Sequence, residues 1–131
     1  MMADKIIIAK RKSVIGRGKI RSGTGKIRIN GKLIDAYNDK FLSLYIQTPL
    51  VLSNETYKKY DIDIKVRGGG PVGRASVVRS VIAKALASKE KSLHKKFIEY
   101  DRTLLVDDKR TTEPQKPYRS AARALKQTSY R

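Results

Sequence analysis

The sequence contains no cysteine and no tryptophan, and it has a single histidine. Without cysteine the chain can form neither a disulfide framework nor a thiolate metal site. No stretch approaches the roughly 20 apolar residues that cross a bilayer, and the first residues show no secretory signal. The pair Asp107-Asp108 has no accompanying histidine or carboxylate cluster, so it is interpreted as a surface turn. We therefore expect no membrane partner, no metal, no cofactor and no small-molecule substrate.

Candidate catalytic groups are equally scarce. His94 lies among Lys91, Lys95 and Lys96, so it is interpreted as an exposed helix residue rather than a general base. Aromatic residues offer stacking surfaces for bases, but Phe41, Tyr45 and Phe97 occupy helical positions compatible with a core. Only Tyr118 and Tyr130, both in the basic segment at the end of the chain, are candidates for stacking on bases, and the residues leave this open for both. No catalytic residue is predicted, and the chain is expected not to be an enzyme.

What the sequence has in excess is positive charge. The 131 residues, enough for one compact domain, include 30 Lys and Arg against 12 Asp and Glu, a net charge of +18. Such an excess opposes compaction unless an anionic partner neutralises it. With a membrane-spanning segment absent, nucleic acid is the favoured partner.

The positive charge is concentrated in two acid-free segments. One runs from Lys5 to Lys32 and the other follows Glu113. Each alone is typical of a solvated face, but two such segments at opposite ends of a short chain indicate an electrostatic footprint for nucleic acid. Phosphate contacts are expected above all from Lys10, Arg11, Lys12 and Arg17. The further basic residues predicted to bind RNA are Arg21, Lys26, Lys109, Arg110, Lys116, Arg119, Arg123 and Lys126.

Alternation of apolar and polar residues predicts a sheet with one buried face. Turn chemistry separates its strands at Ser22-Gly23-Thr24-Gly25 and at Asn30-Gly31. The clearest strand places Ile62, Ile64 and Val66 on one side. The expected strands are Ile6–Ala9, Ser13–Arg21, Lys26–Ile29 and Asp61–Arg67.

Helices are expected to cover the buried face of this sheet. The first has Asn38 or Asp39 as its cap, carries Phe41, Leu44 and Tyr45, and ends before Pro49. The second shows an apolar stripe from Arg74 to about Ser88. A short third helix contains Leu93 and Phe97, with Ser92 as a possible cap.

These elements predict an α/β fold of two layers, with a globular body over residues 1–101. After Asp101 the periodicity fades, and Pro114 and Pro117 disfavour a helix. Residues 102–131 lack the apolar side chains for a core, so they are predicted to be an extended basic arm that becomes ordered on its partner.

Two glycine-rich sequences have the composition of phosphate-binding loops. Gly23-Thr24-Gly25-Lys26 has isoleucine at positions 20 and 27, where the nucleotide-binding motif needs glycine and Ser or Thr, so a hairpin turn is favoured. The second sequence joins the clearest strand to the longest helix, where glycine lets the backbone approach a phosphate and the helix start presents free N–H groups. A sharp chain reversal explains one or two of these glycines, and anion contact is favoured in addition. The residues leave open whether the anion is RNA or a nucleotide; they are Gly68, Gly69, Gly70, Gly73 and Arg74.

Six segments, in order along nearly the whole chain, carry a resemblance to a known family. They are Gly25–Gly31, Gln47–Leu50, Val66–Ala75, Arg79–Leu86, Ala122-Arg123 and Gln127–Arg131. Together they resemble the ninth protein of the small ribosomal subunit. Bacterial members usually end in Ser-Lys-Arg, whereas the Ser-Tyr-Arg ending here is typical of the archaeal and eukaryotic branch. The absence of a long lysine-rich N-terminal extension favours an archaeal member.

The resemblance implies the fold of the second domain of ribosomal protein five, with about four strands and helices on one face. It implies a structural role in the cytoplasmic ribosome, with the body bound to small-subunit ribosomal RNA in the head beside neighbouring head proteins. Lys116, Arg119, Arg123 and Lys126 would line the route of the arm through RNA. At the end of the arm, Arg131 would contact the peptidyl-site tRNA, with Tyr130 beside it in place of the bacterial lysine.

Two alternatives remain at this point. The same fold occurs in small-molecule kinases with a glycine-rich loop, for which the Gly68–Gly73 segment would bind a nucleotide. A general nucleic-acid chaperone would share the basic composition and bind duplex DNA as well as RNA.

Overall fold

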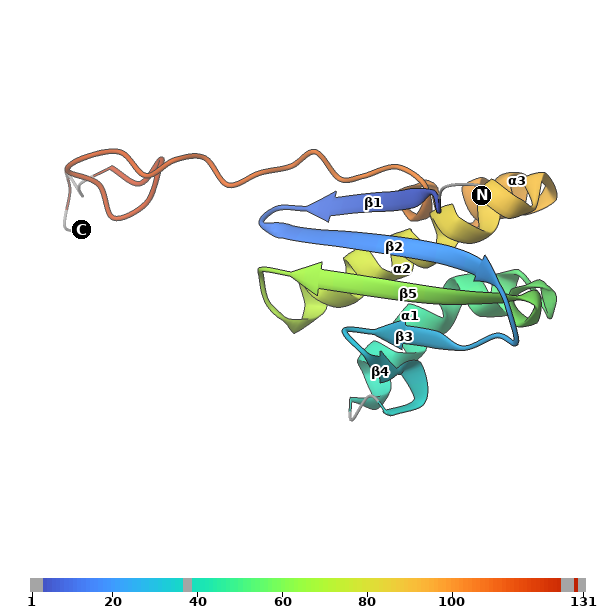
Figure 1. Ribbon diagram of the computed structural model, residues 1–131. Helices are drawn as coiled ribbons and strands as arrows, with labels where there is room; N and C mark the ends of the chain where they lie inside the picture. The colour runs from blue at the N-terminus through green and yellow to red at the C-terminus, as the bar shows by residue number, and fades with distance from the viewer. Residues whose placement is uncertain (1–3, 37–38, 126–128, 130–131) are drawn as a thin grey trace.

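The computed structural model describes residues 4–36, 39–125 and 129. It has two layers: a mixed sheet on one side and helices on the other (Figure 1). The strand order is β1-β2-β5-β3-β4; β3 and β5 run parallel, and the other neighbouring strands are antiparallel. The strands are β1 Ile6–Arg11, β2 Val14–Ser22, β3 Ile27–Ile29, β4 Lys32–Leu33 and β5 Tyr60–Arg67. The predicted two-layer class is confirmed, with the two-residue β4 as a fifth strand.

The helices all lie on one face of the sheet (Figure 1). They are α1 Lys40–Leu52, α2 Pro71–Lys89 and α3 Lys91–Tyr100, and the 3₁₀ turns are η1 Ile34–Ala36, η2 Thr56–Lys59 and η3 Arg102–Leu104. Helix α2 starts three residues before the predicted Arg74, because Pro71 suits the first helical turn. Buried side chains of β5, including Ile62 and Ile64, pack in one core with Val81 of α2 and Phe97 of α3.

Two glycines of β2 bring α2 close to the sheet. Gly16 and Gly18 alternate with exposed residues, so both face the helix layer. A Cβ at Gly16 would overlap Val77, and one at Gly18 would overlap Val81. The absence of these side chains is therefore what allows α2 to lie against β2. This role was not predicted from the sequence.

The first helix corrects one expectation from the sequence. Asp39, one of the two predicted caps, is the N-cap, and its Oδ1 accepts hydrogen bonds from the N–H groups of Phe41 (3.0 Å) and Leu42 (3.3 Å). Pro49, however, lies inside α1 rather than beyond its end. A proline leaves the carbonyl four residues earlier without its helical donor. Here the hydroxyl of Thr48 donates to that carbonyl, on Tyr45, at 2.9 Å, and the helix continues to Leu52.

Side-chain positions on the helices bring two further corrections. Phe41 was predicted to be core-compatible but is 73% exposed, and Leu44 is 68% exposed. The buried side of α1 is formed instead by Leu42, Ile46, Pro49 and Leu50. Ser92 does not cap α3, because the helix begins at Lys91 and its N-cap position is Glu90. The predicted third helix, the core position of Phe97 and the exposure of His94 are confirmed, and Leu93 is buried as well.

After α3 the chain remains against the body before it leaves. Leu104 of η3 is fully buried, and the carboxylate of Asp107 pairs with Lys84 of α2 at 2.6 Å. A single parallel bridge joins Asp108 to Arg11 at the end of β1. Beyond this point the chain runs past the end of β1 and away from the sheet (Figure 1), and none of residues 109–125 is buried.

Candidate nucleic-acid interface

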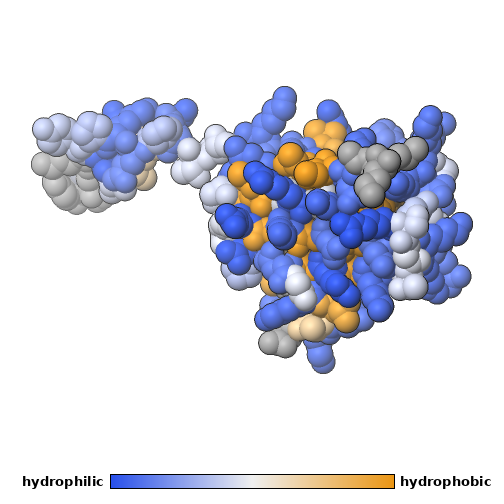
Figure 2. Space-filling view, in the orientation of Figure 1, coloured by the Kyte–Doolittle hydropathy of each residue, from blue (hydrophilic) through white to orange (hydrophobic). Residues whose placement is uncertain are grey.

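The face of the sheet opposite the helices is open to solvent and predominantly basic. Because side chains alternate along a strand, every second residue of β1, β2, β3 and β5 points to this face. Figure 2 shows it as hydrophilic side chains with apolar patches between them. Its basic residues are Lys10, Arg17, Lys19, Arg21, Arg28, Lys65 and Arg67, and its acidic residues are Asp61 and Asp63. We call this surface the open face.

Strand register sets like charges next to each other on the open face. Arg17 of β2 lies directly opposite Lys65 of β5, an arrangement that destabilises an isolated sheet. No ion pair of Arg17 or Lys65 occurs in the part of the chain that the structure describes. Arg21 differs, since its guanidinium lies 3.1 Å from the carboxylate of Asp4. The centre of the open face is thus a fixed group of cations suited to an anionic partner.

Apolar side chains lie between these cations. Ile6, Ile8 and Ile15 are 54%, 55% and 41% exposed, and in the register Ile8 lies opposite Arg17 while Ile15 lies opposite Arg67. An apolar surface beside guanidinium groups suits a ligand with both flat apolar and anionic parts, as a polynucleotide has.

The predicted glycine-rich loop lies at one end of the sheet, beside the β1–β2 turn. Gly68 and Gly69 have positive φ angles of +88° and +58°. A Cβ on Gly68 would lie 2.5 Å from the carbonyl oxygen of Ser13, and one on Gly69 would overlap Val14. Chain reversal and close packing therefore account for these two glycines.

The rest of this loop has a different environment. A Cβ on Gly70 would meet nothing within 4 Å, whereas one on Gly73 would lie 3.2 Å from Val14. Arg74 is exposed in the first turn of α2, and its Nε donates to the carbonyl of Gly68 at 2.8 Å. Lys12, in the β1–β2 turn with a φ of 52°, is exposed at the same end of the sheet. This end therefore gathers two of the predicted cations around an open backbone at Gly70.

The other glycine sequence already holds an anion of the protein itself. Oδ1 of Asp61 accepts hydrogen bonds from the N–H groups of Lys26 (2.9 Å), Thr24 (2.9 Å) and Gly25 (3.0 Å). These bonds, that of Lys26 first, lower the pKa of Asp61 below its ordinary value. The predicted turn at Ser22–Gly25 is confirmed, and its N–H groups are occupied by a carboxylate.

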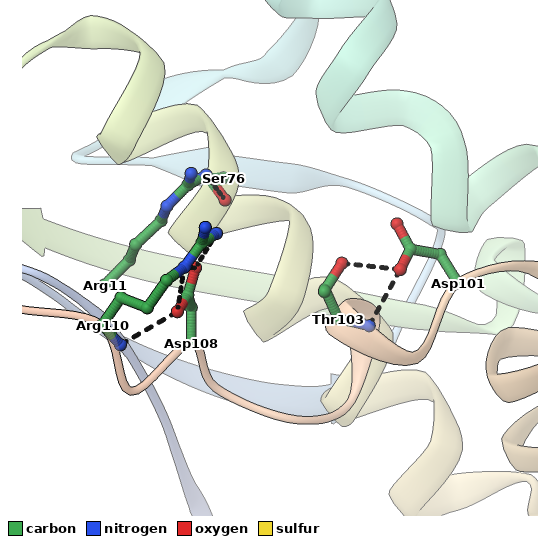
Figure 3. A network of polar contacts seen from close by, with 6 residues as sticks. All are labelled: Arg11, Ser76, Asp101, Thr103, Asp108 and Arg110. Atoms are coloured by element: carbon green, nitrogen blue, oxygen red, sulfur yellow. Dashed lines mark hydrogen bonds and ion pairs between the residues drawn. The ribbon is translucent and has the colours of Figure 1, made fainter.

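Not every predicted cation points to the open face. Arg11, half-buried at the end of β1, donates from Nη1 to Oγ of Ser76 on α2 at 2.9 Å (Figure 3). Arg110 wraps around the carboxylate of Asp108, with Nη2 2.7 Å from Oδ2 (Figure 3). The hydrogen bond from Arg110 lowers the pKa of Asp108. Both cations lie on the helix side of β1, around a hollow of about 230 Å³.

The arm pairs its own charges. Glu113 accepts from Nζ of Lys116 at 2.8 Å and from Nε of Arg123 at 2.6 Å, and these bonds, that of Arg123 first, lower its pKa. The amide of Gln115 donates to the carbonyl of Arg119. Lys109 and Tyr118 are exposed, the latter completely. The predicted contacts Lys126, Tyr130 and Arg131 lie outside the described residues.

Sequence comparisons identify the family. Residues 9–131 match the family described as ribosomal protein S9/S16. The chain belongs to this family. The protein called small ribosomal subunit protein uS9 from Methanococcus maripaludis strain C7 is 40% identical over 128 residues, which cover 95% of this chain and 96% of that protein. The uS9 protein of strain S2 matches to the same extent. The predicted resemblance, of archaeal type, is confirmed.

Family membership settles the general class of the molecule. It is a structural constituent of the small subunit of the cytoplasmic ribosome and not an enzyme. Within the described residues no helix is long and apolar enough to cross a membrane. The same residues contain no group of three or more His, Asp or Glu side chains that could hold a metal ion.

The structure also adds open-face cations that the prediction omitted. Lys19, Arg28, Lys65 and Arg67 project from the same face as Lys10 and Arg17. Period-2 alternation in Lys26–Ile29 and Asp61–Arg67 already placed such residues on the polar side of the sheet. What the sequence could not give was the strand order, which brings β5 next to β2 and so Lys65 next to Arg17.

Proposed function

We propose that the body binds ribosomal RNA of the subunit head through its open face and through the turn end of the sheet. The observation that supports this most strongly is the register of Arg17 opposite Lys65, two cations held side by side by the sheet and without an ion pair among the described residues. A surface that is destabilising alone becomes favourable when phosphates lie against it. Lys10, Lys12, Arg17, Arg21 and Lys26 would supply contacts there, together with Gly70, Gly73 and Arg74.

The arm would follow the same RNA with Lys109, Lys116, Arg119 and Arg123, and with Tyr118 stacking on a base. Glu113 holds Lys116 and Arg123 through exposed pairs, which contribute little free energy. RNA phosphates would therefore displace Glu113 at small cost. Beyond the described residues, Lys126 would continue this path, and Tyr130 and Arg131 would reach the peptidyl-site tRNA.

Arg11 and Arg110 differ from the other predicted contacts, because both form hydrogen bonds within the protein. Each already has a partner, Ser76 and Asp108 respectively. Each retains guanidinium donors for phosphate beyond that partner, since the group has five. We therefore keep both as RNA contacts at the edge of the surface, with smaller expected contributions than Arg17.

The proposal is tested against the nucleic-acid chaperone by competition. Full-length protein is bound to a head-domain ribosomal RNA fragment and challenged with random RNA of matched length or with duplex DNA. We expect the ribosomal fragment to resist both competitors by at least about 1000-fold, in the range of specific over non-specific nucleic-acid binding. Equal competition by duplex DNA would favour the chaperone.

The role of the arm is tested with subunits reconstituted with full-length protein or with protein lacking Ser129–Arg131. A single charge-assisted contact is worth about 1 to 3 kcal/mol. Deletion should therefore leave assembly nearly normal while the rate of tRNA release from the peptidyl site rises about tenfold. If both kinds of subunit release tRNA at the same rate, Arg131 is not a tRNA contact and the arm serves as an anchor in RNA.

A further inference from the structure

Helix α1 carries an apolar stripe that no element of the described chain covers. Phe41, Leu44 and Val51 are 73%, 68% and 73% exposed. With the half-buried Thr48 they are spaced by three, four and three residues, so they form one line along the helix. This spacing is that of a seam between two packed helices.

The scarcity of charged residues along this stripe disfavours RNA as its partner. Residues 41–54 contain no Lys, Arg, Asp or Glu, in a chain where charged residues make up 32%. Lys40, four residues before Leu44, is the one charged residue of α1, so a phosphate backbone would meet a cation at only one end of the stripe, and RNA affinity depends on phosphate contacts. The stripe therefore suits an apolar protein surface rather than RNA.

A groove continues the stripe at the end of α1. It has a volume of about 350 Å³ and is lined by Ile27, Ile34, Leu50, Val51 and Tyr57, among others. Asp35 is the one charged side chain in its lining, and its carboxylate would repel a phosphate. The same carboxylate would accept a lysine or arginine of a protein partner. Stripe and groove together offer an apolar seam that ends at a single acid.

The size of the seam and the net charge exclude a second copy of this chain as the partner. A 13-residue helix is roughly 20 Å long and presents a seam of about 200 Å². A stable interface needs about 800 Å² from each partner. Two copies, each with a net charge of +18, would also repel each other. The partner must therefore be held near α1 by further contacts, as a protein bound to the same RNA would be.

We propose that the stripe formed by Phe41, Leu44 and Val51 is the docking site for an amphipathic helix of a neighbouring protein of the same subunit, with a basic residue of that helix set against Asp35. The proposal rests on the proposed function, because RNA brings the two proteins together. It assigns α1 to protein recognition and leaves RNA recognition to the open face.

The test uses small subunits assembled with full-length chain that carries a photo-crosslinking benzoylphenylalanine at Leu44, at Lys65 or at Lys95. The Leu44 probe should give an adduct that survives ribonuclease and contains a second ribosomal protein. The Lys65 probe on the open face should give an adduct that ribonuclease removes. The Lys95 probe, on the exposed side of α3, sets the background.

Each other outcome at Leu44 overturns the proposal: an adduct that ribonuclease removes, a dimer of this chain, or no adduct above the Lys95 background. The Lys65 probe tests the proposed function separately. If it gives no RNA adduct, RNA binding by the open face is contradicted, whichever adduct the Leu44 probe gives.

A pair of serine variants gives the matched functional readout. The double variant Phe41→Ser, Leu44→Ser should keep the melting temperature and the affinity for isolated RNA, because both side chains are exposed. With the benzoylphenylalanine placed at Val51 instead of Leu44, the double variant should give at least tenfold less protein adduct than the chain without the two serines. The control Ile98→Ser, an exposed apolar residue of α3, should leave that yield unchanged. Equal yields from the double variant and the control would overturn the proposal.

Discussion

The body and the arm are both basic, but the cations of the body are held in place by the sheet and those of the arm are not. On the body, Arg17, Lys65 and Arg67 are held by strand register above a continuous core, and no ion pair to them is present in the described residues. On the arm, Lys116 and Arg123 share Glu113, and no residue from 109 to 125 is buried. Under the proposed function, the cations of the body are arranged when the chain folds, whereas those of the arm would be arranged on binding.

This difference predicts separate tasks. A rigid group of cations favours one arrangement of phosphates and so positions the protein. An arm without a core would adapt to the path that RNA offers, with a lower affinity for each contact. Mutations in one region should therefore leave the properties of the other region unchanged.

The largest effect is expected from Gly16→Val, which destroys the platform under the open face. The new side chain would overlap Val77 and approach Val81 of α2. Such overpacking costs about 3 kcal/mol, the upper end of its usual range, which lowers the melting temperature by roughly 10 °C in a body of this size. Thermal unfolding by circular dichroism measures it, with Gly70→Ala as the control, because a Cβ there meets nothing. A stable Gly16→Val protein would mean that α2 does not need its close approach to β2.

Removal of residues 113–131 should leave the stability of the body unchanged and weaken RNA binding. The free energy of unfolding should change by less than about 0.5 kcal/mol, because none of the removed residues that the structure describes is buried. RNA binding should lose about 4 units of log-log salt slope, for the five cations Lys116, Arg119, Arg123, Lys126 and Arg131 at about 0.7 to 0.9 each. Calorimetry and filter binding on one preparation give both values. Parallel loss of stability would show that the arm is part of the folded body.

The smallest effect concerns the turn held by Asp61. Its pKa is lowered in the folded protein, first by the hydrogen bond from Lys26 N–H. The carboxylate therefore stabilises the fold above its unfolded pKa, and this contribution is lost as pH falls through the folded pKa. Asp61→Asn should melt below wild type at pH 7, and the two curves should converge as the pH falls below about 4. Parallel curves for Asp61→Asn and wild type over this pH range would show that the carboxylate does not stabilise the turn.

The sequence was most informative where local chemistry decides the structure. Period-2 alternation identified the buried side of β5, and Asn30-Gly31 identified the β3–β4 turn, where both residues have positive φ. It failed at Pro49, because the donor that replaces the missing N–H is a neighbouring threonine, and at Phe41, whose exposure depends on what lies beside α1. The juxtaposition of Arg17 and Lys65 needed the strand order, which arises from contacts far apart in the chain. The sequence thus predicted that the protein has a basic surface, but it could not predict which cations lie side by side on it.

The central claim is that position, and not total charge, makes the open face an RNA surface. Two variants with the same net charge separate these factors: Lys10→Ala, Arg17→Ala, Lys65→Ala, Arg67→Ala on the open face, and Lys89→Ala, Lys91→Ala, Lys95→Ala, Lys96→Ala on and beside α3. The measurement is the salt dependence of binding to a head-domain ribosomal RNA fragment. The account predicts that the open-face variant loses about 3 units of log-log slope while the α3 variant keeps nearly the wild-type slope. Equal losses in the two variants would contradict it.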